Sequence, residues 1–181
     1  MLIDWGIPRP NELGRSLSNY IAGDMASALD IAVGIANDIP VPLIGYCMGG
    51  TLTAALAAIS PGKISALVLL AAPWDFHVGT DGPPVAVTAG RAGLEQLISA
   101  EGCLSVDALQ SMFFSIDPLQ GWTKFQAFSK IAVDSRAAES FVALEDWLND
   151  GVPLAAGVAR DCLFGWYGDN SPARGTWEGS G

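Results

Sequence analysis

The pattern Gly-x-Cys-x-Gly at residues 45–49 constrains the fold more than any other feature of this 181-residue chain. A short apolar run at 41–46 leads into Cys47, and a run rich in Ala, Leu and Thr follows at 49–59. The first run is typical of a buried strand and the second of a buried helix. A cysteine at a tight turn between a strand and a helix is in the setting of a nucleophile elbow, so the sequence predicts that Cys47 is a nucleophile.

Each residue around Cys47 has a physical role in such an elbow. Gly45 and Gly49 are expected to give the clearance that a tight turn needs, with Gly50 beside them. The helix that follows directs its N-terminal N–H groups and positive dipole end at the sulfur, which favours the reactive thiolate. The N–H of Met48 is expected to donate to the oxyanion that forms when a carbonyl is attacked. The alternative is a small buried cysteine that happens to lie between glycines; the flanking strand and helix favour the elbow.

The elements around the elbow predict an α/β fold. Residues 18–37 carry apolar side chains at helical spacing, and residues 64–71 are apolar and β-branched, as in a parallel strand covered on both faces. Residues 1–5 are interpreted as the end of another strand. Strand and helix therefore alternate, which predicts an open, mostly parallel sheet with helices on both faces and right-handed crossovers.

The character of the chain changes after residue 75. Residues 76–93 are rich in glycine and proline and are expected to be irregular, whereas 94–116 and 123–150 are expected to be helical. The helical stretches carry aromatic side chains at Phe113, Phe114, Phe125, Phe128, Phe141 and Trp147. Such helices suit a lid over a pocket, and ordinary helix packing explains the pattern equally well.

These patterns divide the chain into three parts. Residues 1–75 are expected to form a core segment with the elbow, residues 76–167 a helical cap or insert, and residues 168–181 a polar, flexible tail. No strand pattern follows residue 150, so the chain is expected to stop before the rest of the core.

The other members of a catalytic triad are not evident. The one histidine, His77, lies 30 residues after Cys47, before an acid-bearing strand has room to form. A loop or surface histidine is therefore the favoured interpretation, and we expect the triad acid and histidine to be absent from this chain. Cys103 and Cys162 lack an elbow context and are assigned no role.

Composition narrows the possible partners. The net charge of −10 opposes binding to nucleic acid, and no apolar run is long enough to predict a membrane span. One histidine and three widely spaced cysteines do not suggest a metal site or a disulfide framework. We expect no cofactor, no metal and no nucleic acid, and a reducing cytoplasm as the location.

Several further motifs accompany the box at 45–52. They are Asp4-Trp5-Gly6, Asn19-Tyr20-Ile21, the apolar segment 67–76, residues 117–120 with Trp122, and the run 144–153. In this order they resemble the polyhydroxyalkanoate synthases of the poly(3-hydroxybutyrate) type, which belong to the α/β-hydrolase superfamily. The resemblance implies a partial α/β-hydrolase fold with a helical cap insert, and the central part of a longer synthase.

The resemblance also implies a reaction. Such enzymes polymerise (R)-3-hydroxyacyl-CoA to polyester and release CoA, with the acyl group held on the cysteine. Carried over, Cys47 holds that thioester and the Met48 N–H belongs to the oxyanion hole, while an aspartate and a histidine complete the triad from outside this chain. The implied partners are the CoA substrate, the growing polyester, and a second copy or a synthase partner subunit. The implied location is the cytoplasm, including the surface of polyester granules.

Two other functions stay open at this point. The first is a cysteine hydrolase of the dienelactone hydrolase kind, which uses a similar elbow but does not call for the long aromatic segment or the run 144–153. The second is a non-catalytic partner that binds another synthase chain through unpaired strand edges.

Overall fold

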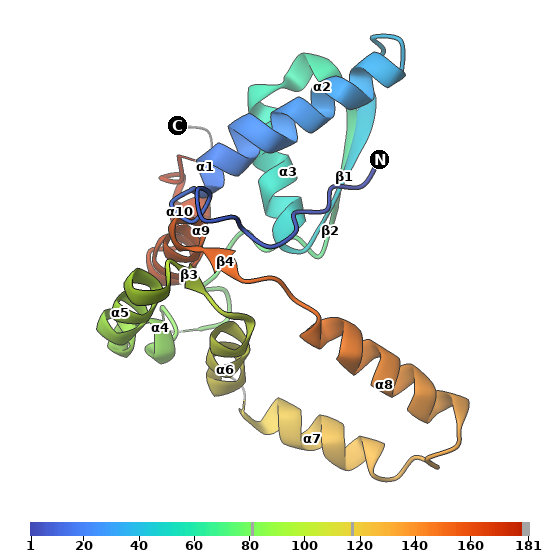
Figure 1. The fold of residues 1–181 in the computed structure, drawn as a ribbon, viewed down its shortest axis with the longest axis vertical. Helices are drawn as coiled ribbons and strands as arrows, with labels where there is room; N and C mark the ends of the chain where they lie inside the picture. The colour runs from blue at the N-terminus through green and yellow to red at the C-terminus, as the bar shows by residue number, and fades with distance from the viewer. Residues whose placement is uncertain (81, 117, 179–181) are drawn as a thin grey trace.

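A two-stranded parallel sheet carries the predicted strand-to-helix corner. The computed structural model describes residues 1–80, 82–116 and 118–178 (Figure 1). Strand β1 (Val41–Tyr46) pairs with β2 (Ile64–Leu70), so that Gly45 lies opposite Leu69 and Tyr46 opposite Leu70. Helix α3 (Met48–Ile59) and the 3-10 turn η2 (Pro61–Lys63) connect the two strands. This strand–helix–strand unit matches the predicted elements closely, because each has a strong local apolar pattern.

The helix predicted at 18–37 is present but is not uniform. It consists of α1 (Leu17–Asn19), the π-helical turn η1 (Tyr20–Met25) and α2 (Ala26–Ile35). Ser16 caps it: its hydroxyl accepts a hydrogen bond from the Asn19 N–H, and the Asn19 side chain accepts one from the Ser16 N–H. Its apolar stripe packs against α3 in one buried cluster, which includes Leu17, Ile21, Met25, Leu29, Leu52 and Leu56.

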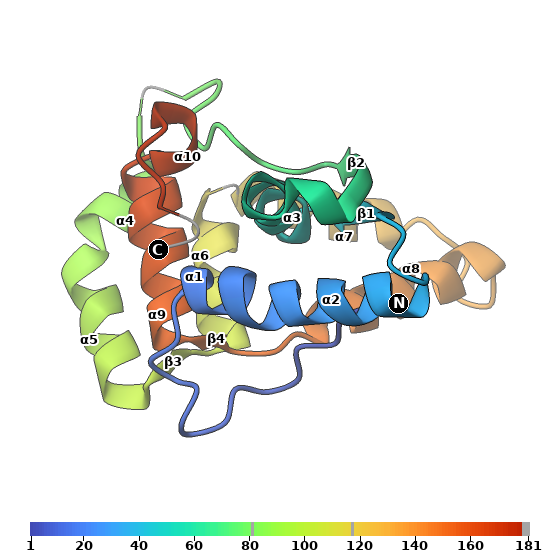
Figure 2. The ribbon, with the colours of Figure 1, turned by 90° about the horizontal axis from the view of Figure 1, so that it is seen from above.

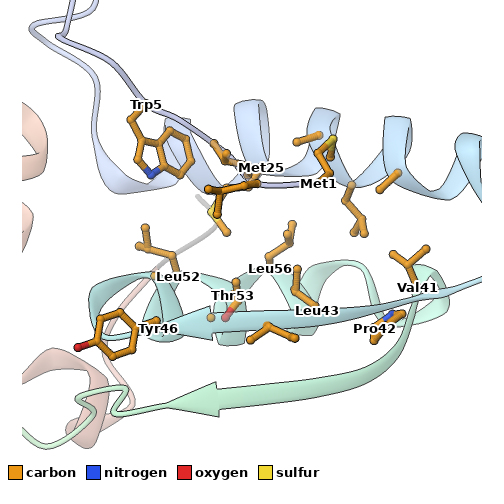
Figure 3. Close-up of a pocket in the computed structure, with 18 of the residues that line it drawn as sticks. Met1, Trp5, Met25, Val41, Pro42, Leu43, Tyr46, Leu52, Thr53 and Leu56 are labelled. Atoms are coloured by element: carbon orange, nitrogen blue, oxygen red, sulfur yellow. The ribbon is translucent and has the colours of Figure 1, made fainter.

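The sheet is narrower and more open than the sequence predicts. Residues 1–5 approach β1 but form no strand, and a groove of about 790 Å³ separates Met1 from the β1 residues Val41 and Leu43 (Figure 3). On β1, Ile44 and Tyr46 are exposed instead of lying under a second helical layer. Among the described residues, helices therefore cover the sheet from the α3 side.

The second half of the chain is mostly helical and continues away from the sheet. Its elements are α4 (Val85–Ala89), α5 (Arg91–Glu101), β3 (Cys103–Leu104), α6 (Val106–Ile116), α7 (Pro118–Phe128), α8 (Arg136–Asn149), β4 (Leu154–Ala155), α9 (Ala156–Arg160), the π-helical segment η3 (Asp161–Gly168) and α10 (Ser171–Arg174). Helices α7 and α8 form an arm that extends from the body (Figure 1). Phe128 and Phe141 stack in this arm with ring centroids 4.2 Å apart. Asp117, in the motif at 117–120, lies outside the described residues.

The single helix expected at 94–116 is broken near its middle. Gly102 adopts a left-handed conformation, φ +70°, and ends α5. The chain then forms β3, which pairs antiparallel with β4: Cys103 lies opposite Ala155. This short ribbon returns the chain from the arm to α9 and η3, around which α4, α5 and α6 gather (Figure 2).

The region expected to be a flexible tail begins with ordered, buried structure. Asn170 is only 7% exposed and α10 follows it at once. The polar, glycine-rich composition of residues 168–181 predicted a flexible segment, but the polar side chain of Asn170 is buried in the fold. Residues 179–181 of that region lie outside the described residues. Within the described part of the chain, no helix combines the length and apolar character needed to cross a bilayer.

Candidate active site

Cys47 stands at the corner between β1 and α3 in an unusual backbone conformation. Its dihedral angles are φ +52° and ψ −127°, which L-residues rarely adopt. Hydrogen bonds hold the corner on both sides: the Cys47 N–H donates to the Leu70 carbonyl at 2.9 Å, and the Cys47 carbonyl accepts from the Gly50 N–H at 2.9 Å. The Cys47 side chain is exposed. A strained, exposed residue between a strand and a helix has the geometry of a nucleophile elbow.

Close packing explains two of the three glycines around Cys47. A Cβ atom on Gly45 would lie 2.6 Å from the Gly50 Cα, and one on Gly50 would lie 2.5 Å from the Ala72 Cβ. Gly49 has no neighbour within 4 Å of the corresponding position. The sequence pattern assigned the clearance to Gly45 and Gly49, whereas the structure needs it at Gly45 and Gly50. The reason is that Gly50, one step further round the helix, faces the sheet.

The first turn of α3 provides hydrogen-bond donors beside the sulfur. Met48 and Gly49 are the first two residues of this 12-residue helix. Backbone N–H groups at these positions have no acceptor within a helix, and the helix dipole places partial positive charge there. An oxyanion on a carbonyl attacked by Cys47 is the kind of group that such donors stabilise.

The loop after β2 is fixed against the elbow. The Thr51 hydroxyl donates to the Pro73 carbonyl at 2.6 Å. Two residues on, Asp75 and Phe76 are held by Asn170, whose side-chain Nδ2 donates to Asp75 Oδ1 at 2.7 Å and whose Oδ1 accepts from the Phe76 N–H at 3.0 Å. The hydrogen bond from Asn170 lowers the pKa of Asp75, with a further contribution from the His77 N–H. Asn170 thus ties the C-terminal segment to the active-site loop.

We expect that replacing Asn170 by alanine destabilises the fold by about 2–4 kcal/mol. The change leaves the Phe76 N–H without its acceptor and places alanine at φ +52°. Urea unfolding measures the loss. Asn37→Ala is the matched control, because Asn37 is exposed at φ +56° and isolates the backbone cost. Equal losses in the two variants would contradict a role for the Asn170 side chain.

Tyr167 is a neighbour of the site that the sequence did not single out. Its ring contacts that of Phe76 at 4.9 Å between centroids. Burial raises the pKa of the Tyr167 hydroxyl, with further contributions from the Cys162 and Cys47 thiols. The backbone carbonyl of Tyr167 is 2.8 Å from His77 Nε2. This hydrogen bond uses one ring nitrogen of His77 and holds the loop after β2 to η3. His77 lies in that loop.

The three cysteines differ in environment, and chemical labelling should separate them. Cys162 is buried, and burial together with the neighbouring Asp161 raises the pKa of its thiol. We expect iodoacetamide to modify Cys47 at least about tenfold faster than Cys162, because reaction requires an accessible thiolate. Peptide mass mapping measures both rates in the folded chain. Equal rates that become faster together in urea would mean that Cys47 is as protected as Cys162.

The described residues contain no group of three or more histidine, cysteine, aspartate or glutamate side chains placed to hold a metal ion.

Known proteins of two kinds are similar to this chain. Residues 5–91 match the family described as alpha/beta hydrolase fold. The chain is 28% identical over 184 residues to the poly(3-hydroxyalkanoate) polymerase subunit PhaC of Synechocystis sp., covering 96% of this chain and 47% of that protein. It is 30% identical over 180 residues to the protein of the same name from Haloferax mediterranei, covering 96% of this chain and 35% of that protein. The chain thus spans between about a third and a half of the relatives it matches. The expected fold class and the resemblance to polyhydroxyalkanoate synthases are confirmed.

Proposed function

We propose that this chain, which is similar to the alpha/beta hydrolase fold family over residues 5–91 and to PhaC polymerase subunits, acts in polyester synthesis as an acyltransferase segment. The substrate is an (R)-3-hydroxyacyl-CoA thioester, and Cys47 is the nucleophile. The observation that carries the proposal is the exposed Cys47 side chain at φ +52°, at the start of α3. That position combines access for a substrate with backbone donors for the charge that develops on its carbonyl oxygen.

The first step is a thioester exchange. The Cys47 thiolate attacks the carbonyl carbon of the CoA thioester, and the negative charge moves to the carbonyl oxygen, where the Met48 N–H donates to it. The bond between that carbon and the CoA sulfur then breaks. CoA leaves as a thiolate and takes up the proton that the Cys47 thiol gave up, so one thioester replaces another with little change in free energy.

The second step transfers the acyl group to an alcohol. The hydroxyl of another 3-hydroxyacyl unit attacks the Cys47 thioester, an ester bond forms, and the Cys47 sulfur leaves and recovers a proton. This step needs a base to accept the hydroxyl proton. In this proposal the base and its supporting acid are not residues of this chain, since His77 Nε2 is directed at the Tyr167 carbonyl. The chain then works with a synthase partner subunit that supplies them.

The first step provides a direct test, because it requires only Cys47 and its backbone donors. The purified chain is incubated with (R)-3-hydroxybutyryl-CoA, and intact-mass spectrometry with peptide mapping follows the adduct. We expect one 3-hydroxybutyryl group on Cys47, reversed by excess CoA, with one free CoA released per adduct. An accessible Cys47 that accepts iodoacetamide but never the acyl group would refute the proposal.

The same experiment distinguishes acyl transfer from hydrolysis. A transferase segment holds its acyl group until an alcohol arrives, so the adduct should persist in buffer and decay when a 3-hydroxyacyl acceptor and a partner chain are added. A cysteine hydrolase would release free 3-hydroxybutyrate to water without an acceptor. Continuous release of free acid by the chain alone would favour the hydrolase.

A further inference from the structure

An apolar groove of about 790 Å³ runs beside β1, between that strand and residues 1–5 (Figure 3). All six residues of β1 line it, from Val41 to Tyr46. Because successive side chains of a strand point to opposite faces, contact with all six means that the groove lies along an edge of β1 and not against one face. The other edge of β1 pairs with β2. The groove therefore follows the edge of β1 that β2 does not use.

This edge of β1 presents backbone groups that are available for pairing. The Cys47 N–H donates to the Leu70 carbonyl at the end of β2. Backbone groups along a strand alternate in direction, so those of residues 43 and 45 also face β2, and those of 42, 44 and 46 face the groove. Position 42 is proline, which has no N–H and is confined to edge positions of a sheet. Within the described part of the chain, no backbone hydrogen bond other than those with β2 reaches β1, so Ile44 and Tyr46 can pair with another strand.

The groove has the size and lining of a site for one short strand. A strand in a packed sheet fills about 160 Å³ per residue, given a rise of about 3.3 Å, a strand spacing of about 4.8 Å and a layer thickness of about 10 Å. A groove of about 790 Å³ thus holds about five residues, close to the length of β1. None of the residues that line it has a charged side chain, and Met25, Leu29 and Leu56 form its wall on the helical side. An extended, apolar segment fits such a groove.

The direction of an added strand follows from the segments on either side of the groove. Residues 1–5 run in the same direction as β1, since Trp5 lies near the Tyr46 end and Met1 lies nearer Val41 (Figure 3). Strands β1 and β2 are also parallel. A strand in the groove would therefore lie parallel to β1, with its carboxyl end toward Gly49 in the first turn of α3. The chain that follows it would begin beside the Cys47 corner.

We propose that this groove binds one apolar, extended segment of the synthase partner subunit, which adds to β1 as a parallel strand. Strand addition gives affinity through backbone hydrogen bonds and selectivity through side-chain contacts. The choice of occupant rests on the proposed function, in which a partner supplies the base and its supporting acid. The PhaC relatives have chain available for such a segment, because this chain covers 47% of one and 35% of another. A second copy of this chain is a poorer occupant, because its strongest strand patterns are already paired as β1 and β2.

Short overlapping peptides that cover the PhaC protein of Synechocystis sp. and this chain itself are the probes. Fluorescence anisotropy measures their binding to the purified chain. We expect binding by peptides from the part of PhaC that this chain does not match, each with a continuous apolar run of about five residues. Binding only by peptides of this chain's own sequence would make the occupant a second copy. That result, or binding by no peptide, would overturn the proposal.

Methylated versions of a bound peptide test whether it pairs with β1. N-methylation of alternate residues removes the N–H groups that point to one edge of an extended peptide. Because β1 bonds to one edge only, methylation of the set that faces β1 should weaken binding at least about tenfold, and methylation of the other set should have a smaller effect. Equal losses from the two sets, or no loss from either, would show that the peptide does not add to β1 as a strand.

A charge placed in the groove tests the location of the peptide. Ala32 lines the groove from α2 and is half-buried, so Ala32→Glu should weaken peptide binding at least about tenfold. Ala22→Glu is the matched control, because Ala22 is exposed in η1 and should leave the affinity unchanged. An affinity that Ala32→Glu does not change would contradict binding in the groove.

Loading of Cys47 by (R)-3-hydroxybutyryl-CoA is measured without any peptide, so the two proposals can fail separately. Loading without peptide binding would overturn the assignment of the groove and leave the proposed function intact. Peptide binding without loading, while iodoacetamide still labels Cys47, would overturn the proposed function and leave the groove as a site for strand addition.

Discussion

Replacing Cys47 by alanine should reduce covalent acyl loading by at least about 1,000-fold, to the background level, because no other group in the site can form the thioester. The thiol of Cys162 is buried and its pKa is raised, and Cys103 lies in the short strand β3, outside the corner between β1 and α3. Alanine at position 47 keeps the same positive φ that cysteine accepts, so the fold should persist. Intact-mass spectrometry after incubation with (R)-3-hydroxybutyryl-CoA measures the loading.

The control for this substitution is Cys103→Ala, which removes a thiol from a half-buried position outside the elbow. It should load at the rate of the unmodified chain. An acyl adduct that survives in Cys47→Ala and maps to another residue would place the nucleophile elsewhere and remove the basis of the proposed function. Circular dichroism of both variants shows whether a lost adduct reflects a lost fold.

Local patterns in the sequence predict the strand–helix–strand unit well. The boundaries of β1 and α3 follow from continuous apolar runs that end at Pro40 on one side and at Pro61 on the other. The break at Gly102 also has a local signal, since a glycine commonly ends a helix in the left-handed conformation. The sequence interpretation passed over that glycine because the apolar spacing continues on both sides of it.

Features that depend on distant residues were harder to predict. Residues 1–5 have the composition of a strand, but a strand also requires a partner, and β1 lies across a groove from them. Asn170 looked like part of a polar tail, and its role is visible only when Asp75 and Phe76 are beside it. The position of Cys47 could be predicted because strand, turn and helix are contiguous there. The small pocket beside the first turn of α3 could not, since its walls come from four stretches of the chain, within 5–8, 17–20, 48–52 and 152–158.

Gly45 lies two residues before Cys47, and Gly45→Ala should destabilise the fold by about 3–5 kcal/mol. A loss of that size is enough to unfold a marginally stable domain. The added Cβ would meet the Thr53 hydroxyl, and it would lie 2.6 Å from the Gly50 Cα and 2.7 Å from the Gly49 carbonyl oxygen. None of these groups can move aside easily. Two are backbone atoms of α3, and the buried Thr53 hydroxyl donates to the Gly50 carbonyl at 2.9 Å. Relief therefore requires α3 to shift away from β1, which breaks the elbow.

Gly49→Ala supplies the matched comparison, four residues along the same motif. A Cβ there meets nothing within 4 Å, and the position is helical, so alanine should stabilise the fold by about 0.5–1 kcal/mol. The two substitutions add the same methyl group to glycines of one sequence pattern and should change the urea midpoint in opposite directions. If both variants unfold at the midpoint of the unmodified chain, then α3 does not pack on β1 at the distance described. The backbone strain at Cys47 would then have no support from the glycines around it.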